Sequence, residues 1–315
     1  MLNRRHIRIK VMQSLYAFKG HESDDLAKDE RFLMHSLDSM LDLYLSILAL
    51  LTELHKKSKD YNEKLQKKLL GSDSDRNPNT KFQDNLLLSI ISDNKMLQDI
   101  IAKRKLNFWD LDFEYVDILF KAIKNSELYE DYINDTEEAN LKRDKQFIID
   151  VYTEIIAPND KLFDYFEDKK LTWVDDFPVV NTVLLKVLRK VKLTSSDTKL
   201  LPDLYKDEDD KEFAKDLFKK TVLNNSKFVE EISKRTTNWD SERLASLDGL
   251  LLKMALCEFQ KFPSIPHKVT INEYLEIAKE YSTPKSSLFI NGILDKIVKE
   301  YQSKDLFPKA GRGLM

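Results

Sequence analysis

The fold of this chain is decided by residues 239–301, which read WDSERLASLDGLLLKMALCEFQKFPSIPHKVTINEYLEIAKEYSTPKSSLFINGILDKIVKEY. From Leu247 to Phe259 apolar residues recur at steps of three and four, the spacing that gives an α-helix one buried face. Pro263 and Pro266 then interrupt the pattern, because proline cannot continue a helix interior. The stretch therefore begins with one buried helix that ends before Pro263.

Two further helices are expected in the same stretch. Thr270 and Glu273 have the spacing of a capping box, so we expect the second helix to begin near Thr270. Ser282 and Thr283 are good N-cap residues, and Pro284 suits the first turn of a third helix. Three packed helices result, and the predicted fold class is all-α.

Composition supports long helices. The chain has 315 residues, of which 42% are hydrophobic, and only six glycines and eight prolines are available for hairpins and loops. This length is typical of about two domains with buried cores. The formal net charge is only −3, so any nucleic-acid binding has to come from a local basic patch.

Several classes of protein are excluded by what the sequence lacks. Cys257 is the only cysteine, which excludes an internal disulfide and a multi-cysteine zinc site and leaves a buried free thiol. No run reaches the roughly 18 apolar residues of a membrane span, and no secretory signal is visible, so we expect a soluble cytoplasmic protein. The five histidines lack metal-ligand spacing, and no phosphate loop or nucleophile elbow occurs. We expect no enzyme, no metal and no cofactor.

An amphipathic helix is predicted over residues 3–19. Its first apolar face contains Ile7, Val11 and Leu15, and a second face contains Ile9, Met12 and Tyr16. Two explanations stay open for the second face: burial on both sides within a bundle, or a docking face for a partner protein.

The same helix carries a local excess of positive charge, with no acidic residue before Glu22. Lysines and arginines release counterions when they meet an RNA backbone, and arginine also stacks on unpaired bases. The alternative is a solvated basic helix start. The predicted RNA contacts here are Arg4, Arg5, Arg8 and Lys10.

The start of the last helix is a second candidate. Backbone N–H groups near Lys285 and Ser286 lie at the positive end of a helix dipole, which suits a phosphate. Phe289 is either a base-stacking residue or part of the core. Gly292 inside the helix predicts a close helix crossing. We expect the two basic regions to converge on one surface patch.

The middle of the chain contains a candidate repeat. Residues 24–70 predict one long helix or two joined helices, and residues 71–80 predict a polar linker. Residues 145–188 align without a gap on residues 211–254, and a fainter copy matches Trp109 to Trp173. Each copy would be a helix, an Asn-containing turn and a second helix that leads to a tryptophan. The alternative is a chance match between amphipathic helices; stacked hairpins would instead supply an extra surface for a partner.

The C-terminal stretch and the first residues resemble the NusB family of bacterial transcription antitermination factors. The resemblance rests on motifs at both ends of the chain, and the middle is not covered by it. The motifs are Trp239 with Glu242-Arg243-Leu244, Ala255-Leu-Cys-Glu258, Ile265-Pro-His-Lys268-Val, Ile271-Asn-Glu273, Ala278-Lys279, Phe289-Ile-Asn-Gly292-Ile-Leu-Asp295, Arg4-Arg5-His-Ile-Arg8 and Gln13-Ser-Leu15-Tyr16.

The resemblance implies a NusB-like helical bundle, to which the middle of the chain would add the helical hairpins of the candidate repeat. The domains are then residues 1–20 as the N-terminal helix, 21–204 as an insertion, 205–302 as the RNA- and partner-binding core, and 303–315 as a flexible tail. It implies binding of boxA-type RNA with ribosomal protein NusE in the RNA polymerase antitermination complex. Lys268 joins the RNA contacts, and Tyr16, Met12 and Asp248 are carried over as partner contacts.

Two rivals remain. One is a helical-repeat adaptor that binds protein without RNA. The other is the related module fused to RNA cytosine methyltransferases, but no methyltransferase fold or catalytic cysteine motif follows in this chain.

Overall fold

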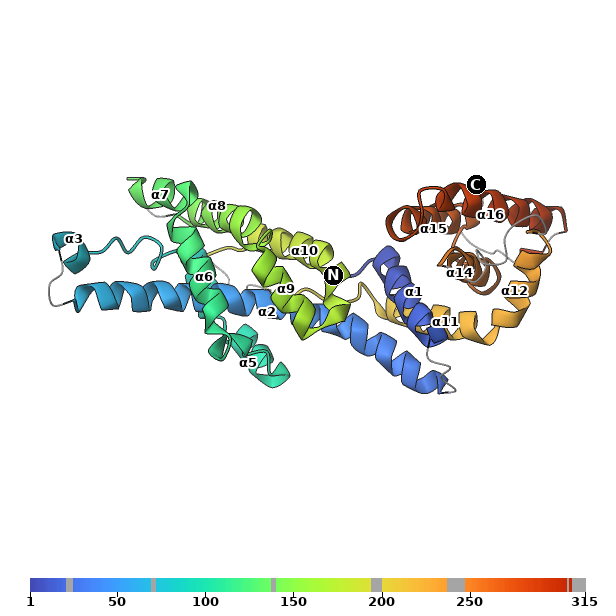
Figure 1. The fold of residues 1–315 in the computed structure, drawn as a ribbon, viewed down its shortest axis with the longest axis horizontal. Helices are drawn as coiled ribbons and strands as arrows, with labels where there is room; N and C mark the ends of the chain where they lie inside the picture. The colour runs from blue at the N-terminus through green and yellow to red at the C-terminus, as the bar shows by residue number, and fades with distance from the viewer. Residues whose placement is uncertain are drawn as a thin grey trace. The chain divides into compact units, whose positions relative to one another are not determined.

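A computed structural model describes residues 1–20, 25–68, 72–136, 140–193, 200–236, 247–304 and 306–307. Within these ranges the fold is all-α and contains no strand (Figure 1). The chain divides into two compact units. The first comprises Asp38–Leu204 with Met1, and the second comprises Leu2–Leu37 and Tyr205–Met315.

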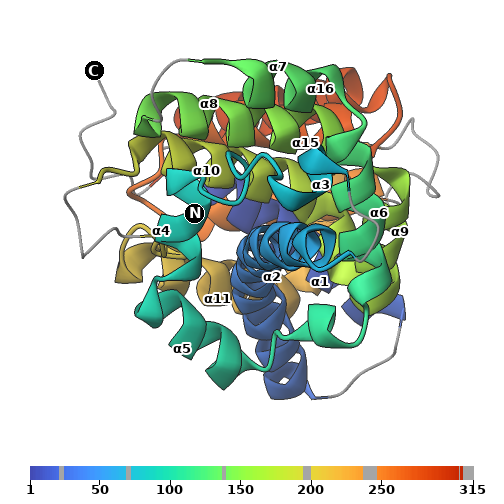
Figure 2. The ribbon, with the colours of Figure 1, turned by 90° about the vertical axis from the view of Figure 1, so that its left-hand side faces the viewer.

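The first unit is built around α2 (Leu26–Gln66), a continuous helix of 41 residues whose start, up to Leu37, belongs to the second unit. Figure 2 looks nearly along α2 and shows shorter helices arranged around it. Between Leu43 and Leu54 almost every apolar side chain of α2 is buried, as expected for a helix covered on several sides. The other helices of this unit are α3 (Asp73–Arg76), α4 (Leu86–Ser92), α5 (Lys95–Arg104), α6 (Phe113–Lys124), α7 (Glu127–Asn134), α8 (Leu141–Val151), α9 (Asp160–Lys169) and α10 (Phe177–Lys190).

Short helical turns connect some of these helices. They are the 3₁₀ turn Phe108–Asp110, the π-turn Tyr152–Ile156 and the 3₁₀ turn Leu171–Asp176. The region 71–80, predicted as a polar loop, contains the single helical turn α3, which is started by a capping box at Ser72.

Two tryptophans occupy equivalent positions in the first unit. The Trp109 indole N–H donates to the carbonyl of Ser46 at 3.0 Å, and the Trp173 indole N–H donates to the carbonyl of Ser39 at 2.7 Å. Both acceptors lie on α2, seven residues or about two helical turns apart. The repeat proposed from the sequence thus brings both tryptophans to the same helix.

The asparagines of these two copies are also equivalent. Asn94 caps α5 by accepting the Leu97 N–H, and Asn159 caps α9 by accepting the Leu162 N–H. In the third copy Asn225 instead accepts from Lys253. Trp239 and the motif around it lie outside the described residues, as do 308–315 of the predicted tail.

The second unit is a bundle in which α14 is buried from Asp248 to Phe259 except at Lys253. It packs against α1, α11, α12, α15 and α16. Cys257 on α14 is a fully buried free thiol, as expected. The helices are α1 (Arg4–Gly20), α11 (Glu208–Leu223), α12 (Asn225–Ser233), α14 (Leu247–Lys261), α15 (His267–Tyr281) and α16 (Ser286–Ser303).

Two local predictions are wrong. Helix α15 begins at His267, not near Thr270, because Pro266 provides the N-cap backbone and Thr270 donates to Glu258 instead of capping. Gly292 does not mark a close helix crossing, since a Cβ built there meets nothing within 4 Å. No helix in the described ranges is long and apolar enough to cross a membrane.

Candidate functional site

A cavity of about 550 Å³ lies where the start of α1 meets the segment between α14 and α15. Arg4 and Arg5 contribute side chains from the first turn of α1, and both are about 40% exposed. Its opposite wall includes Ser264 and Pro266, just before α15. The side chains of Arg4 and Arg5 and the positive end of a helix dipole therefore meet at one cavity. Lys268, in the first turn of α15, is exposed but is not part of the cavity lining.

The two exposed arginines are held by carboxylates. Arg5 makes a bidentate pair with Glu273, with both N–O distances at 2.9 Å. Arg4 donates to Asp210 at 2.8 Å, and its guanidinium lies 5.1 Å from the Phe213 ring centroid. The hydrogen bond from Arg5 lowers the pKa of Glu273 below its ordinary value. These contacts orient the arginines while leaving part of each guanidinium open to solvent.

Arg8 is placed differently. It is 2% exposed and makes a bidentate pair with Glu258, which is completely buried, at 2.6 and 2.8 Å. Glu258 also accepts from Thr270 at 3.1 Å and from Tyr274 at 2.8 Å. This cluster of four residues, the Arg8–Glu258 network, joins α1, α14 and α15. We therefore reassign Arg8 from a phosphate contact to the support of the surface.

Burial and charge both shape this network. Desolvation acts to lower the pKa of Arg8, but the hydrogen bond and charge of Glu258 outweigh it and the pKa is raised overall. Desolvation, followed by the charge of Glu258, raises the pKa of Tyr274 well above its ordinary value. Arg8 thus stays charged and Tyr274 stays a hydrogen-bond donor throughout the neutral pH range.

The start of α16 is a separate region. Lys285 is exposed at its N-cap, but Ser286 is fully buried and donates to Asp248 at 2.9 Å. Asp248 also accepts from Ser282 at 2.6 Å. Phe289 is buried at 5% exposure. Ser286 and Phe289 therefore hold the turn before α16 in place, and Lys285 is the one exposed member of the three predicted contacts there.

The two basic regions lie at opposite ends of α15. Lys268 is in its first turn and Lys285 follows its last turn, and a helix of 15 residues is about 22 Å long. The single compact patch expected from the sequence is therefore wrong, and the structure provides two separate basic regions.

The remaining predicted contacts differ in exposure. Tyr16 is 61% exposed and free to meet a partner, whereas Met12, Asp248 and Lys10 are buried. The second apolar face of α1 is thus mostly covered within the second unit. Among the described residues, no group of three or more histidines, cysteines or carboxylates is arranged to hold a metal.

Sequence reasoning missed the carboxylates that organise the site. Asp210, Glu258 and Glu273 each hold one of the N-terminal arginines. One signal was present: Glu258 stands in the apolar run of α14, where a buried charge requires a partner of opposite sign.

Comparison with known proteins places residues 181–299 in the family model described as the NusB family. A protein named Transcription antitermination protein NusB from Salinibacter ruber is 40% identical over 112 residues, which cover 36% of this chain and 70% of that protein. Proteins of the same name from Chloroherpeton thalassium and Koribacter versatilis are 38% and 39% identical; the matches cover 41% and 31% of this chain, and 61% and 67% of those proteins. No solved structure matches the chain significantly.

Proposed function

This chain belongs to the NusB family, and from that premise we propose that it binds boxA-type RNA together with ribosomal protein NusE. It is a transcription antitermination factor, the function that its relatives' names state. The proposed action is scaffolding: the chain holds RNA and partner within the RNA polymerase antitermination complex, and no bond is made or broken. The observation that carries the proposal is the cavity flanked by Arg4 and Arg5.

We propose that an RNA phosphate competes with Glu273 for Arg5. The guanidinium fork that now binds a carboxylate at two points also fits two phosphate oxygens. Arg5 is already oriented toward the cavity, so less side-chain entropy is lost when RNA binds. Arg4 and Lys268 supply further phosphate contacts, and Lys285 contacts RNA that extends along α15.

The buried predicted residues have supporting roles in this proposal. The Arg8–Glu258 network fixes the start of α1 against α14 and α15. Asp248, Ser286 and Phe289 fix the turn that presents Lys285, while Lys10 and Met12 belong to the packed side of α1. For the protein partner, exposed Tyr16 is the proposed contact, because its ring presents apolar area and a hydroxyl at low entropic cost.

Titration of labelled RNA at several salt concentrations tests the proposal. The RNA contains boxA or a scrambled sequence, and NusE is present or absent. For single strands, log K falls with log salt by about 0.7 per phosphate contact, so Arg5→Ala should lower that slope by about 0.7 and the double variant Arg4→Ala/Arg5→Ala by about 1.4. Arg31→Ala is the matched control, since Arg31 is 71% exposed near the start of α2.

The outcomes are distinct. If the slope of log K against log salt is unchanged in the double variant, Arg4 and Arg5 do not contact the RNA. Equal affinity for boxA and scrambled RNA, with NusE present, contradicts sequence-specific binding.

The alternative function is a helical-repeat adaptor that binds protein only. The equivalent contacts of Trp109 and Trp173 with α2 fit the repeated hairpins on which this alternative rests. If the chain were only a protein-binding adaptor, it would show no salt-dependent affinity for RNA.

A further inference from the structure

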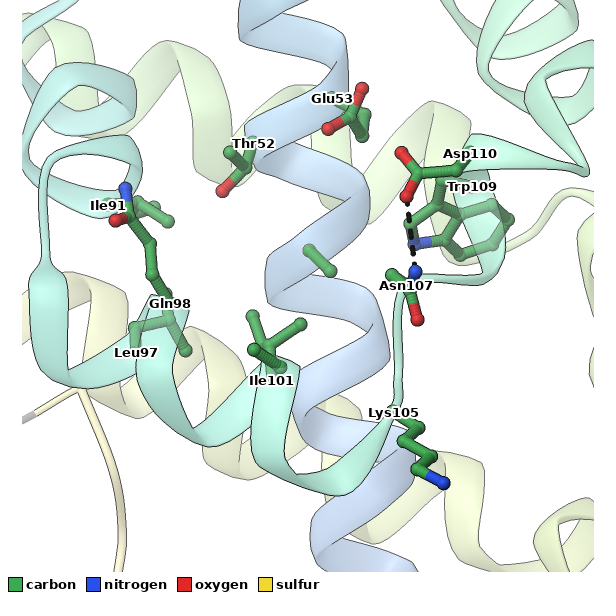
Figure 3. Close-up of a pocket in the computed structure, with 12 residues that line it drawn as sticks. Thr52, Glu53, Ile91, Leu97, Gln98, Ile101, Lys105, Asn107, Trp109 and Asp110 are labelled. Carbon is green, nitrogen blue, oxygen red and sulfur yellow. Dashed lines mark hydrogen bonds between the residues drawn. The ribbon is translucent and has the colours of Figure 1, made fainter.

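The first unit contains an open cavity of about 490 Å³ between α2, the α4–α5 pair and the turn that carries Trp109 (Figure 3). In Figure 3, Ile91 and Gln98 lie to the left of α2, Ile101 overlaps it, and the turn with Trp109 lies to its right. This volume is within the range of ligand-binding pockets, about 300–1,000 Å³. The apolar part of the lining is Ala49, Ile91, Leu97, Ile101, Ala102 and Trp109.

The second copy of the repeat indicates what would fill this cavity. With Asn94 aligned to Asn159 and Leu97 to Leu162, Ile101 aligns with Phe166. Phe166 packs edge-on against Trp173, with ring centroids 5.7 Å apart. In the first copy the smaller Ile101 stands at this position, and Ile101 and Trp109 both line the open cavity. Trp109 also packs against Tyr165 and Phe166 of the second copy, with ring centroids 5.2 and 5.8 Å apart.

A second pair of positions shows the same loss of aromatic rings. Gln98, which lines the cavity, aligns with Phe163. After the tryptophans, Phe113 aligns with Phe177, the first residue of the following helix in each copy. Phe177 lies 5.3 Å from Phe163, centroid to centroid, and the Phe113 ring is 62% exposed. The first copy therefore has glutamine and isoleucine at two positions where the second copy has phenylalanine.

The rim of the cavity carries the carboxylates of Glu53 and Asp110 and the ammonium group of Lys105 (Figure 3). Glu53 also pairs at 3.4 Å with Lys56, which lies outside the lining. Asp110 accepts a neutral hydrogen bond from Asn107 at 3.2 Å, and its carboxylate complements a cationic side chain of a partner. An aromatic ring with a neighbouring basic residue fits both the apolar lining and this rim.

We propose that this cavity, the Trp109 socket, binds an aromatic side chain of a partner protein, flanked by a lysine or arginine that reaches Glu53 or Asp110. The ring enters the cavity between Ile101 and Trp109, the residues that align with Phe166 and Trp173. Tryptophan and other aromatic residues in desolvated pockets are the usual energetic centres of protein interfaces. This role is independent of the RNA contacts proposed for the second unit.

NMR of the full chain with labelled tryptophan tests the proposal. The three tryptophans give three indole N–H signals, and Trp109→Phe assigns the signal of the socket. The probe is the capped peptide Arg-Phe-Arg, compared with Arg-Ala-Arg, with N-acetylphenylalaninamide and with oligouridylate. Only the Phe peptide should shift the Trp109 signal saturably at the lowest concentrations, and the Trp173 signal should stay in place.

The variant Gln98→Phe/Ile101→Phe copies the second repeat and should fill the socket from within. We expect it to fold with an unchanged or raised unfolding midpoint and to weaken peptide binding at least about tenfold. Leu171→Ala, which removes a side chain that is 76% exposed outside the cavity, is the control and should bind as the wild type does.

Several results would overturn the proposal. These are no shift of Trp109 with either peptide, equal shifts with both peptides, or normal binding by the filled variant. Tighter binding of oligouridylate would assign the socket to RNA, and equal binding of N-acetylphenylalaninamide would assign it to a small aromatic molecule.

Discussion

Replacing Arg8 should destabilise the second unit strongly, and replacing its partner as well should restore much of the loss. The Arg8 guanidinium is 2% exposed and makes two short hydrogen bonds to a fully buried carboxylate. Removing one member of such a pair leaves an uncompensated buried charge, which costs about 3–5 kcal/mol. Arg8→Met keeps an apolar stem of similar length, so the expected loss comes from the stranded Glu258 charge and not from a large cavity.

In Arg8→Met/Glu258→Gln no charge is left buried. The Gln carbonyl oxygen remains as an acceptor for Tyr274 or Thr270, and the residual loss is expected to be about 1–3 kcal/mol, the cost of one weakened buried hydrogen-bonding group. The double variant should therefore be more stable than Arg8→Met, even though it carries one more substitution.

Hydrogen exchange of peptides from α14 and α15 measures this locally, which matters because two units do not unfold as a single two-state system. A double variant that exchanges as fast as Arg8→Met would refute the reasoning. RNA titration of the double variant adds a functional check: an unchanged salt slope fits the supporting role, and a slope lowered by about 0.7 would return Arg8 to the phosphate contacts.

Three further predictions concern other sites. Gly292→Ala should raise stability by about 0.5–1 kcal/mol, because Ala is the better residue in a helix interior and the added Cβ meets no atom within 4 Å; urea denaturation checks this, and a loss would indicate a hidden contact. Cys257 should resist a thiol reagent in the native chain at pH 8, because burial raises its pKa to about 12; rapid labelling without unfolding would contradict it. The Arg5–Glu273 pair should stabilise the fold fully above the ordinary carboxyl pKa of about 4.3, and this contribution should be lost as the pH falls through the lowered pKa of Glu273. The difference in unfolding free energy between wild type and Glu273→Gln should therefore shrink from pH 6 to pH 3. A constant difference would rule out the ion pair as its source.

The sequence predicted helices well and helix starts less well. The period of apolar residues located α1, α2, α14 and α16, because burial of one face dominates such segments. The capping box at Thr270 failed because both of its side chains are engaged by residues far away in the chain: Thr270 by Glu258 and Glu273 by Arg5. Local pattern cannot reveal a competing long-range partner.

The candidate site was predicted in part. Arg5 and Arg8 belong to one basic motif, and charge alone cannot separate them. Their positions on the helix do separate them. Arg8 lies four residues before Met12, on the second apolar face, and both side chains are buried. A helix with two apolar faces was therefore the signal that some of its basic residues would be internal. The paired carboxylates Glu258 and Glu273 depend on the packing of α14 and α15 against α1, which the sequence alone does not fix.

The indole contacts of the first unit restrict how α2 can change in length. The indole N–H groups of Trp109 and Trp173 donate to the carbonyls of Ser46 and Ser39, which lie two turns apart on the same helix. One residue inserted between these serines would rotate one carbonyl by about 100° relative to the other, and seven residues would restore the direction but move the carbonyl about 10 Å along the helix axis. An insertion or deletion between Ser39 and Ser46 should therefore break at least one of the two indole hydrogen bonds, whatever its length.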